Sequence, residues 1–300
     1  EMLRSLVGSE MCIRDSYVIQ ESSMDQKNNI DKKVVSDFGK EWKAFNHQHI
    51  DESMLYSAFD SYFHIFPFSD LKNAEGFDMG CGSGRWAKFV APKVGLLNCI
   101  DPSEAALDEA RANMKNLQNC SFECAGVDNN VLKNESQDFG YSLGVLHHIP
   151  DTSLALESCS KKLKTGAPFL LYLYYRFDNK PKSYYFLWKL SDIARNLISR
   201  LPFKIKYFIS QLIAVFVYLP LARACLLLEK IGVNVSNLPL TWYRNEPFYI
   251  MRTDALDRFG TRLEQRFTKD EISQMLTKIG FEKIQFSNRE PFWTVLSYKK

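Results

Sequence analysis

The sequence predicts an α/β protein built on a doubly wound, mostly parallel sheet. Three observations lead to this fold class. Short apolar runs alternate with helical patterns between about residues 70 and 175, each run is almost continuously apolar, and glycine-rich or acidic loops follow the first runs. Continuously apolar strands are typical of parallel sheets covered on both faces, and such sheets bind ligands at the carboxyl ends of their strands. With 300 residues, 46% of them hydrophobic, the chain can form one large core or a core with an accessory region.

The loop after the first strand has glycine at every second position. Gly80, Gly82 and Gly84 follow Asp78, and Cys81 lies between the first two glycines. Glycine lets a strand turn sharply into a helix while the backbone passes close to a ligand, because it has no Cβ and adopts positive φ at little cost. The pattern predicts a loop that contacts a bound molecule.

The spacing discriminates between nucleoside cofactors. A dinucleotide fingerprint, counted from Gly80, needs a third glycine where this chain has Arg85, which argues against an NAD-dependent oxidoreductase or epimerase. The apolar run 96–100 reads as the second strand, and Asp101 at its end can accept both ribose hydroxyls of a nucleoside. Pro102 follows and leads into a helix.

These motifs resemble those of bacterial class I S-adenosylmethionine-dependent methyltransferases of the small-molecule type. In that family the glycine loop faces the methionine part of the cofactor, and an acidic residue helps to order its ammonium group. The resemblance implies S-adenosylmethionine as the cofactor, methyl transfer as the activity and a seven-stranded sheet whose last strand is antiparallel. The cofactor-binding residues that it implies are Asp78, Gly80, Cys81, Gly82, Gly84, Asp101, Pro102, Val127, Asp128 and Leu143.

The remaining elements of the core follow from caps and apolar runs. Ser103 is a natural N-cap for a helix that reaches about residue 117, and Asp151 or Thr152 caps another that ends at a Lys-Thr-Gly sequence. Thr268 and Glu271 form a capping box for a last helix. The predicted strands are 121–124, 137–143, 168–174, 283–287 and 292–298.

Two adjacent histidines follow the fourth strand. In the family that the motifs resemble, the second of such a pair sometimes lies near the substrate, which makes His148 the candidate general base. His148 could equally hold the loop through hydrogen bonds to the backbone. His147 is interpreted as structural.

The sequence identifies the reaction more closely than it identifies the acceptor of the methyl group. Methyl transfer asks the protein mainly to align the reactants and exclude water, and a hydroxyl acceptor would also need a base. A net charge of +3 is too small for a nucleic-acid footprint, and the loop Leu143–Leu146 lacks the Asn/Asp-Pro-Pro-aromatic signature of DNA methyltransferases. A small-molecule, lipid or glycan acceptor is favoured. The alternative is a noncatalytic cofactor-binding or membrane-surface scaffold protein.

The seven cysteines point to a reducing compartment. Their number is odd, and no Cys-x-x-Cys pair occurs. They are interpreted as reduced, buried thiols of a cytoplasmic protein. If the protein meets lipid, we expect it at the inner face of the membrane. No metal site is expected. The seven are Cys12, Cys81, Cys99, Cys120, Cys124, Cys159 and Cys225.

The first 36 residues are set apart from the fold. Residues 1–16 resemble a translated sequencing-adapter fragment, as found at the ends of metagenomic reading frames, and residues 22–33 are polar and expected to be disordered. Met24 is a candidate start. From residue 37 the sequence predicts two helices, 37–45 and 54–66, which either cover the cofactor or simply pack on the core. These helices and the cofactor-binding core together are expected to span residues 37–175.

Residues 176–267 form an insertion far longer than an ordinary connection, so we expect helices that cap the acceptor site, with residues 268–300 completing the sheet. The apolar run 212–222 contains Pro220 and is followed by Arg223, which argues against a transmembrane span. Segment 203–232 is expected to pack internally, to dimerise or to lie on a membrane. Two polar stretches, 237–244 and 252–261, are interpreted as loops that either fasten the insertion by ion pairs or face the acceptor with Tyr243, Asp257 or Arg258.

Overall fold

A computed structural model describes residues 29–44 and 52–300 of the chain. Seven strands form one sheet in the order β3-β2-β1-β4-β5-β7-β6. All neighbours are parallel except β7, which is antiparallel to both β5 and β6, so the predicted fold class is confirmed. The strands are β1 (Glu75–Met79), β2 (Leu96–Asp101), β3 (Cys120–Cys124), β4 (Phe139–Leu143), β5 (Pro168–Tyr172), β6 (Phe281–Phe286) and β7 (Thr294–Lys299).

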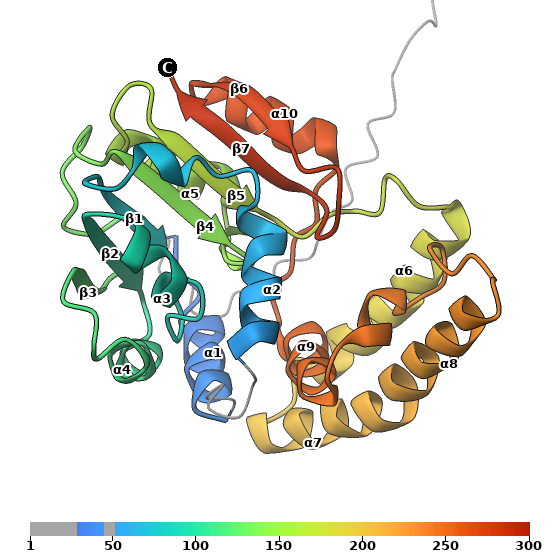
Figure 1. The fold of residues 1–300 in the computed structure, drawn as a ribbon. Coiled ribbons are helices and arrows are strands. Elements are labelled where there is room, and N and C mark those ends of the chain that lie inside the picture. Colours follow the sequence, from blue (N-terminus) through green and yellow to red (C-terminus); the bar gives the residue numbers. More distant parts are fainter. Residues whose placement is uncertain (1–28, 45–51) are drawn as a thin grey trace, which may run out of the picture.

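The sheet separates two apolar cores because successive strand side chains point to opposite faces. On β2, Cys99 packs into one core and Ile100 into the other. Helices cover both faces (Figure 1). The first core includes residues of α2 (Glu52–Phe63), α3 (Ala87–Val90) and α4 (Glu104–Asn113), and the second includes residues of α5 (Thr152–Lys162) and α10 (Lys269–Lys278).

Local capping signals set the starts of these helices. Ser103 Oγ accepts from the Ala106 amide at 3.4 Å, and Asp151 Oδ1 accepts from the Leu154 amide at 2.9 Å. Thr268 and Glu271 form the predicted capping box at the start of α10. Each of these side chains accepts a hydrogen bond from a backbone amide in the first turn, which has no partner within its own helix.

The N-terminal boundary differs from the prediction. Helix α1 (Lys32–Ala44) begins within the segment expected to be disordered, because Asp31 Oδ1 accepts from the amides of Lys33 and Val34 at 2.9 and 3.0 Å. The expected boundary after residue 36 is therefore wrong for residues 32–36. The adapter-like fragment and Met24 lie outside the described residues.

The insertion folds as helices, as predicted, and gathers on one side of the sheet domain (Figure 1). Its elements are α6 (Lys182–Ile198), α7 (Phe203–Ile213), a π-helical segment η4 (Ala214–Tyr218), α8 (Leu219–Lys230), a short 3-10 helix η5 (Thr241–Asn245) and α9 (Phe248–Gly260). The interpretation of residues 252–261 as a loop is wrong. Met251, Ala255 and Phe259 recur at helical spacing and are buried against η4, so packing makes this polar stretch a helix.

The two ends of the insertion meet at the sheet. The Phe267 amide donates to the Tyr174 carbonyl and the Arg176 amide donates to the Phe267 carbonyl, both at 2.9 Å. The segment therefore leaves β5 and returns to it at the same place.

The described cysteines are all free thiols. Cys81, Cys99, Cys159 and Cys225 are buried, as expected. Cys124 is exposed, because it ends the edge strand β3, so the expectation of burial is wrong for this residue. Their reduced state and a cytoplasmic location stay predictions.

Candidate functional site

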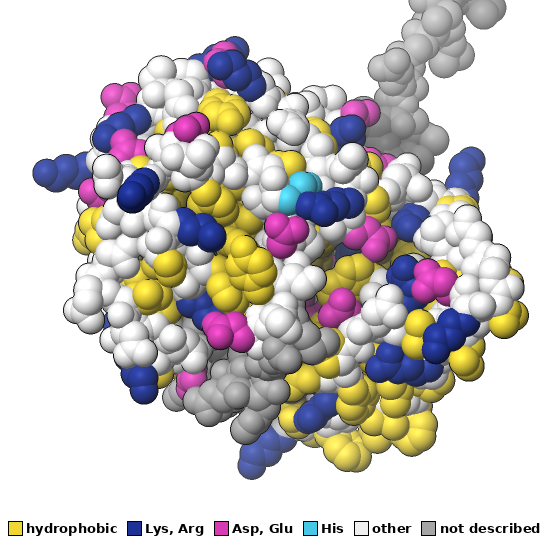
Figure 2. Space-filling view, viewed as in Figure 1, with side chains coloured by type: hydrophobic (Ala, Val, Ile, Leu, Met, Phe, Trp, Pro, Cys, Tyr) yellow, Lys and Arg dark blue, Asp and Glu magenta, His cyan; other side chains and the backbone are white. Residues whose placement is uncertain are grey.

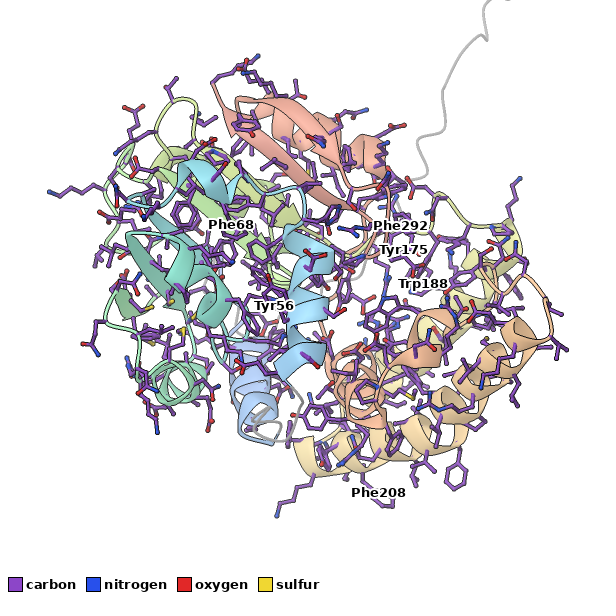
Figure 3. The ribbon with its side chains drawn as sticks, viewed as in Figure 1. Tyr56, Phe68, Tyr175, Trp188, Phe208 and Phe292 are labelled. Carbon is purple, nitrogen blue, oxygen red and sulfur yellow. The ribbon has the colours of Figure 1, made fainter. Side chains whose placement is uncertain are left out.

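A cavity of about 730 Å³ lies between the carboxyl ends of the central strands and the helical insertion. Its lining includes the ends of β1, β2, β4 and β5, part of α1, and residues of α6 and α9. Aromatic side chains dominate the end nearest the insertion: Tyr175, Trp188 and Phe292 come from three separate segments and lie close together there (Figure 3). The cavity joins the glycine loop to the insertion in one continuous space.

The glycine loop forms the first wall of this cavity. Gly80 has φ +82°, and a Cβ built on it would lie 2.4 Å from Val145 Cγ1, so no larger residue fits. Gly80, Cys81 and Gly82 line the cavity. Gly84 does not: a Cβ there would lie 2.9 Å from Met114 Cε, which shows that this glycine allows close packing on α4.

Asp101 is held rigidly at the end of β2. Its Oδ2 accepts from the Gly82 amide at 3.0 Å and its Oδ1 accepts from the Ser103 amide at 2.9 Å. Burial raises the pKa of Asp101 to about 6, although these two backbone donors oppose the shift. Each oxygen keeps a further lone pair, so the carboxylate can still accept two hydroxyl groups from the cavity.

Asp78 lies behind the loop and is not part of the cavity lining. Only 3% of the residue is exposed, and its Oδ2 has no hydrogen-bond partner among the described residues. Burial, together with the nearby charge of Asp101, raises the pKa of Asp78 to about 8. A buried carboxyl oxygen without a partner is costly, and a cation bound at the loop would offset that cost.

The other predicted cofactor residues divide into two groups. Pro102, Val127 and Leu143 line the cavity. Asp128 does not: it is exposed, and its Oδ1 accepts from the Ser158 hydroxyl on α5. The structure therefore does not bring Asp128 to the cavity, because this partner holds the side chain outside it.

His148 lines the cavity from the short 3-10 turn Leu146–His148 that follows β4. Its Nδ1 lies 2.7 Å from the Leu263 carbonyl oxygen, which can only accept, so Nδ1 carries the proton. The lone pair is then on Nε2, which lies 3.8 Å from Asp257 Oδ1. Both predicted roles are thus compatible: one ring nitrogen is held by the backbone and the other is available as a base.

His147 is structural, as expected. Its ring is fully buried and stacks on Tyr174 at 3.8 Å between centroids. Burial lowers its pKa well below the usual value, so the ring stays neutral.

Two carboxylates on α9 form the acidic part of the cavity. Asp257 accepts from the Tyr174 hydroxyl, and Asp254 accepts from the Tyr243 hydroxyl at 2.9 Å. Burial raises the pKa of Asp254 to about 7. Sequence reasoning named Tyr243 and Asp257 but missed Asp254; the i, i+3 spacing would have placed the two aspartates on one face had the stretch been predicted as a helix.

Arg258 also lines the cavity, but its charge is compensated. Arg258 and Arg266 both bond to Glu264 Oε1 at 2.7 Å, and the Glu264 side chain is only 1% exposed. Burial alone would raise the pKa of Glu264, yet the two guanidinium groups outweigh it and lower the value to about 2. Arg258 therefore makes the expected ion pairs and also lines the cavity, while contact of this region with an acceptor stays a prediction.

Within residues 29–44 and 52–300, no group of three or more His, Cys, Asp or Glu side chains is arranged to hold a metal ion.

Comparison with known proteins identifies part of the chain. Residues 77–166 match a family described as "Methyltransferase domain". The ubiquinone biosynthesis O-methyltransferase of Coxiella burnetii is 26% identical over 99 residues, which are 32% of this chain and 42% of that protein. The enzyme of the same name from Alkalilimnicola ehrlichii is 29% identical over 118 residues, 39% of this chain and 47% of that protein. The chain thus matches less than half the length of either relative.

Solved structures give weaker likenesses. A SAM-dependent methyltransferase of Thermotoga maritima has a TM-score of 0.47 and 14% identity, covering 89% of this chain and 100% of that one. A Haemonchus contortus phosphoethanolamine N-methyltransferase has the same score and identity over 88% of this chain and 46% of that one. The fold assignment rests on the strand order and the matched domain.

Proposed function

We propose that the chain is a class I S-adenosylmethionine-dependent methyltransferase, and that it methylates a small-molecule or lipid acceptor bound in the cavity. One observation carries the proposal: a single cavity joins the loop at Gly80 and Asp101 to the polar groups His148, Asp254 and Asp257. A donor and an acceptor would then share one protein-lined space, which favours their alignment.

The residues at the glycine loop fit the proposed cofactor. Asp101 has two lone pairs available for ribose hydroxyls, and the backbone of Gly80 and Gly82 lines the cavity beside it. The partnerless oxygen of Asp78 would be compensated by an ammonium group. S-adenosylmethionine would supply an activated methyl group as part of a sulfonium. Asp128 is not included in this binding set.

The polar groups His148 and Asp257 favour a hydroxyl acceptor. His148 Nε2 would take the hydroxyl proton as the methyl group is transferred, and Asp257 would stabilise the resulting imidazolium charge. The aromatic lining, with Tyr175 and Trp188, suits a planar or apolar acceptor better than a glycan. The O-methyltransferase names of the two relatives support the same choice, with a quinone precursor as the nearest chemical example.

An amine acceptor is the second candidate, favoured by Asp254. Its carboxyl group is buried among tyrosines, where burial raises its pKa to about 7. A cationic amine would pair with the ionised form, but it would have to lose a proton before attack. A noncatalytic cofactor-binding role would be excluded by turnover with any acceptor.

The test of cofactor binding is a thermal melt of the full chain with S-adenosylmethionine, S-adenosylhomocysteine or NAD. A ligand at about 100 times its Kd stabilises by roughly 2.7 kcal/mol, which raises Tm by a few degrees in a chain of this size. We expect stabilisation by both adenosyl compounds and its loss in Asp101→Ala. Stabilisation by NAD alone would overturn the proposal, and an acceptor screen follows a positive result.

A further inference from the structure

The long helix formed by α7, η4 and α8 has its polarity reversed. A surface helix normally turns its apolar stripe to the core and its polar face to water. Here the buried face carries small or polar residues, while large apolar side chains point outward. The buried residues are Lys206, Ser210, Ala214, Tyr218, Ala222 and Cys225, each at most 6% exposed. The outward residues are Ile205, Phe208, Leu212, Phe216, Leu221 and Leu227, each 40–72% exposed.

The π-helical segment η4 keeps these side chains on one side. Its wider turn adds a residue to the helix, so apolar positions before and after it stay on the outer face. Phe208 points away from the rest of the molecule (Figure 3), and hydrophobic side chains gather over α7 and α8 (Figure 2). The exposed apolar stripe therefore continues along most of this helix.

A second stripe lies on the preceding helix. On α6, Phe186, Leu190, Ile193 and Leu197 recur at helical spacing and are 49–67% exposed. We call these four residues and the six outward residues of α7 and α8 the outer face. An exposed apolar surface built by two successive helices marks an interaction site.

The charges around the outer face are mostly positive. Residues 179–233 contain nine Lys or Arg and two Asp or Glu, whereas the whole chain has 38 and 35. Both charges within the apolar part of the long helix point inward: Lys206 bonds to Asp37 at 2.8 Å, and Arg223 donates to the Arg244 carbonyl at 2.6 Å. Exposed basic residues instead stand at or beside the helix ends: Lys182, Arg200, Lys204 and Lys230. Lys189 is also exposed and lies in the middle of α6.

We propose that the outer face docks on an anionic lipid bilayer, with α6 and the α7–α8 helix lying in the plane of the membrane. An apolar stripe between basic ends is the composition that such interfacial helices require. A second copy of the chain fits less well, because two copies would bring the same excess of positive charge together. The proposal concerns binding and does not depend on methyl transfer.

The long helix has 28 residues, and an 18-residue window within it has a mean hydropathy of 2.0, so it is long and apolar enough to span a membrane. Spanning would require it to leave its protein contacts. Its inner face packs against α9 through Ala214, Tyr218 and Ala222, in one cluster with Met251 and Phe259. A helix with one face on protein and one face exposed fits a position at the bilayer surface.

The outer face is continuous with the cavity. Leu190 and Leu221 belong to the outer face and also line the cavity, together with their neighbours Leu187 and Val217. Docking would thus place an apolar rim of the cavity at the bilayer. An acceptor dissolved in lipid could enter without crossing water, a consequence that does rest on the proposed function.

Vesicle flotation of the full chain tests the docking. The probes are vesicles of phosphatidylcholine alone and vesicles of phosphatidylcholine with phosphatidylglycerol. We expect the wild type to float with the anionic vesicles, less so at high salt, and the F208E/F216E variant to lose at least tenfold in partitioning. The matched control is V131E/L154E, which makes the same charge change at apolar residues of the sheet domain that are 79% and 44% exposed.

Unchanged folding of both variants is checked by circular dichroism. Equal flotation of F208E/F216E and the control would overturn the proposal, as would a wild type that stays with the soluble fraction. Light scattering covers the remaining case: a wild-type dimer that becomes a monomer in F208E/F216E would assign the outer face to a second copy instead. Loss of cofactor binding with normal flotation would contradict only the proposed function.

Discussion

Lys206 on α7 reaches Asp37 on α1, with Nζ 2.8 Å from Oδ2, and this ion pair joins the N-terminal helix to the insertion. The same Nζ donates to the Gly260 carbonyl at 2.7 Å. The two partners differ in exposure, at 2% for the Lys206 side chain and 17% for that of Asp37. Water can therefore reach the carboxylate but hardly the ammonium.

This difference predicts an asymmetric effect on stability. Asp37→Asn leaves a charged ammonium buried without its counter-ion, and we expect a loss on the order of 3 kcal/mol in the free energy of unfolding. Lys206→Met should cost less, because the remaining carboxylate is partly hydrated and the thioether fits the apolar surroundings. Urea denaturation measures both. A larger loss for Lys206→Met would show that the hydrogen bond to Gly260 matters more than the ion pair.

Gly80 and Gly144 separate steric contact from backbone strain. Both have positive φ, +82° and +76°, but only at Gly80 would a Cβ meet another side chain; at Gly144 nothing lies within 4 Å. Gly144→Ala should therefore cost only the left-handed conformation, about 1–2 kcal/mol. Gly80→Ala should cost about 1–3 kcal/mol more through its overlap with Val145, and should weaken binding of S-adenosylhomocysteine.

Urea denaturation gives the two stabilities, and calorimetric titration gives the affinity for S-adenosylhomocysteine. Equal losses of stability in the two variants would mean that Val145 moves aside at little cost.

The buried carboxyl group of Asp78 predicts a pH dependence of stability. Its folded-state pKa, about 8, lies above the unfolded value of 3.8, so the stability that it contributes is full below about pH 4 and is lost as pH rises through about 8. Asp78→Asn removes this dependence. We expect the variant to melt several degrees above the wild type above about pH 8, and with little difference near pH 4.

The comparison is made without ligand, by thermal melts of both proteins across the pH range. With S-adenosylmethionine present, the difference in stability at high pH should narrow or reverse, because a cation bound at the glycine loop would stabilise the ionised carboxylate behind it. A wild type that is as stable as Asp78→Asn above pH 8 in the absence of ligand would show that Asp78 is already paired.

The cavity predicts different kinetic effects for His148 and Asp254, depending on the acceptor. For a hydroxyl acceptor, His148→Gln should lower kcat by about 10²–10⁴ with cofactor affinity unchanged, because the proton acceptor is lost. Asp254→Asn should then change KM only slightly. For an amine acceptor we expect the reverse, with a raised KM in Asp254→Asn and a nearly normal kcat in His148→Gln. Steady-state kinetics on the acceptor found by screening distinguish the two.

The sheet and its caps could be predicted because their signals are local. Ser103, Asp151 and the box of Thr268 and Glu271 act within four residues of themselves, and the alternation of apolar runs needs no knowledge of the rest of the chain. The start of α1 was missed although Asp31 is an equally local cap, because the polar residues around it suggested disorder. The polar composition of this segment predicted disorder, whereas the capping signal of Asp31 correctly indicated a helix.

The site was predicted less completely because some of its geometry depends on distant partners. Ser158, thirty positions from Asp128, keeps that side chain away from the cavity. Asp254 enters the cavity only because residues 248–260 pack as a helix against Ala214 and Tyr218 of η4, which a stretch rich in charged residues does not suggest. Gly80, Gly82 and Asp101 were identified correctly as cavity residues, since strand-end loops place them wherever this sheet forms.

The meeting of Tyr174 and Arg176 with Phe267 makes residues 176–267 an exchangeable unit. Because the segment starts and finishes at one point on the sheet, a short turn or a different set of helices could replace it without altering the strand order or the cofactor loop. Under the proposed function and the proposed docking, exchange of this one segment would change the acceptor and the membrane contact together. A chimera that grafts this segment onto another sheet of the same topology would carry both properties with it.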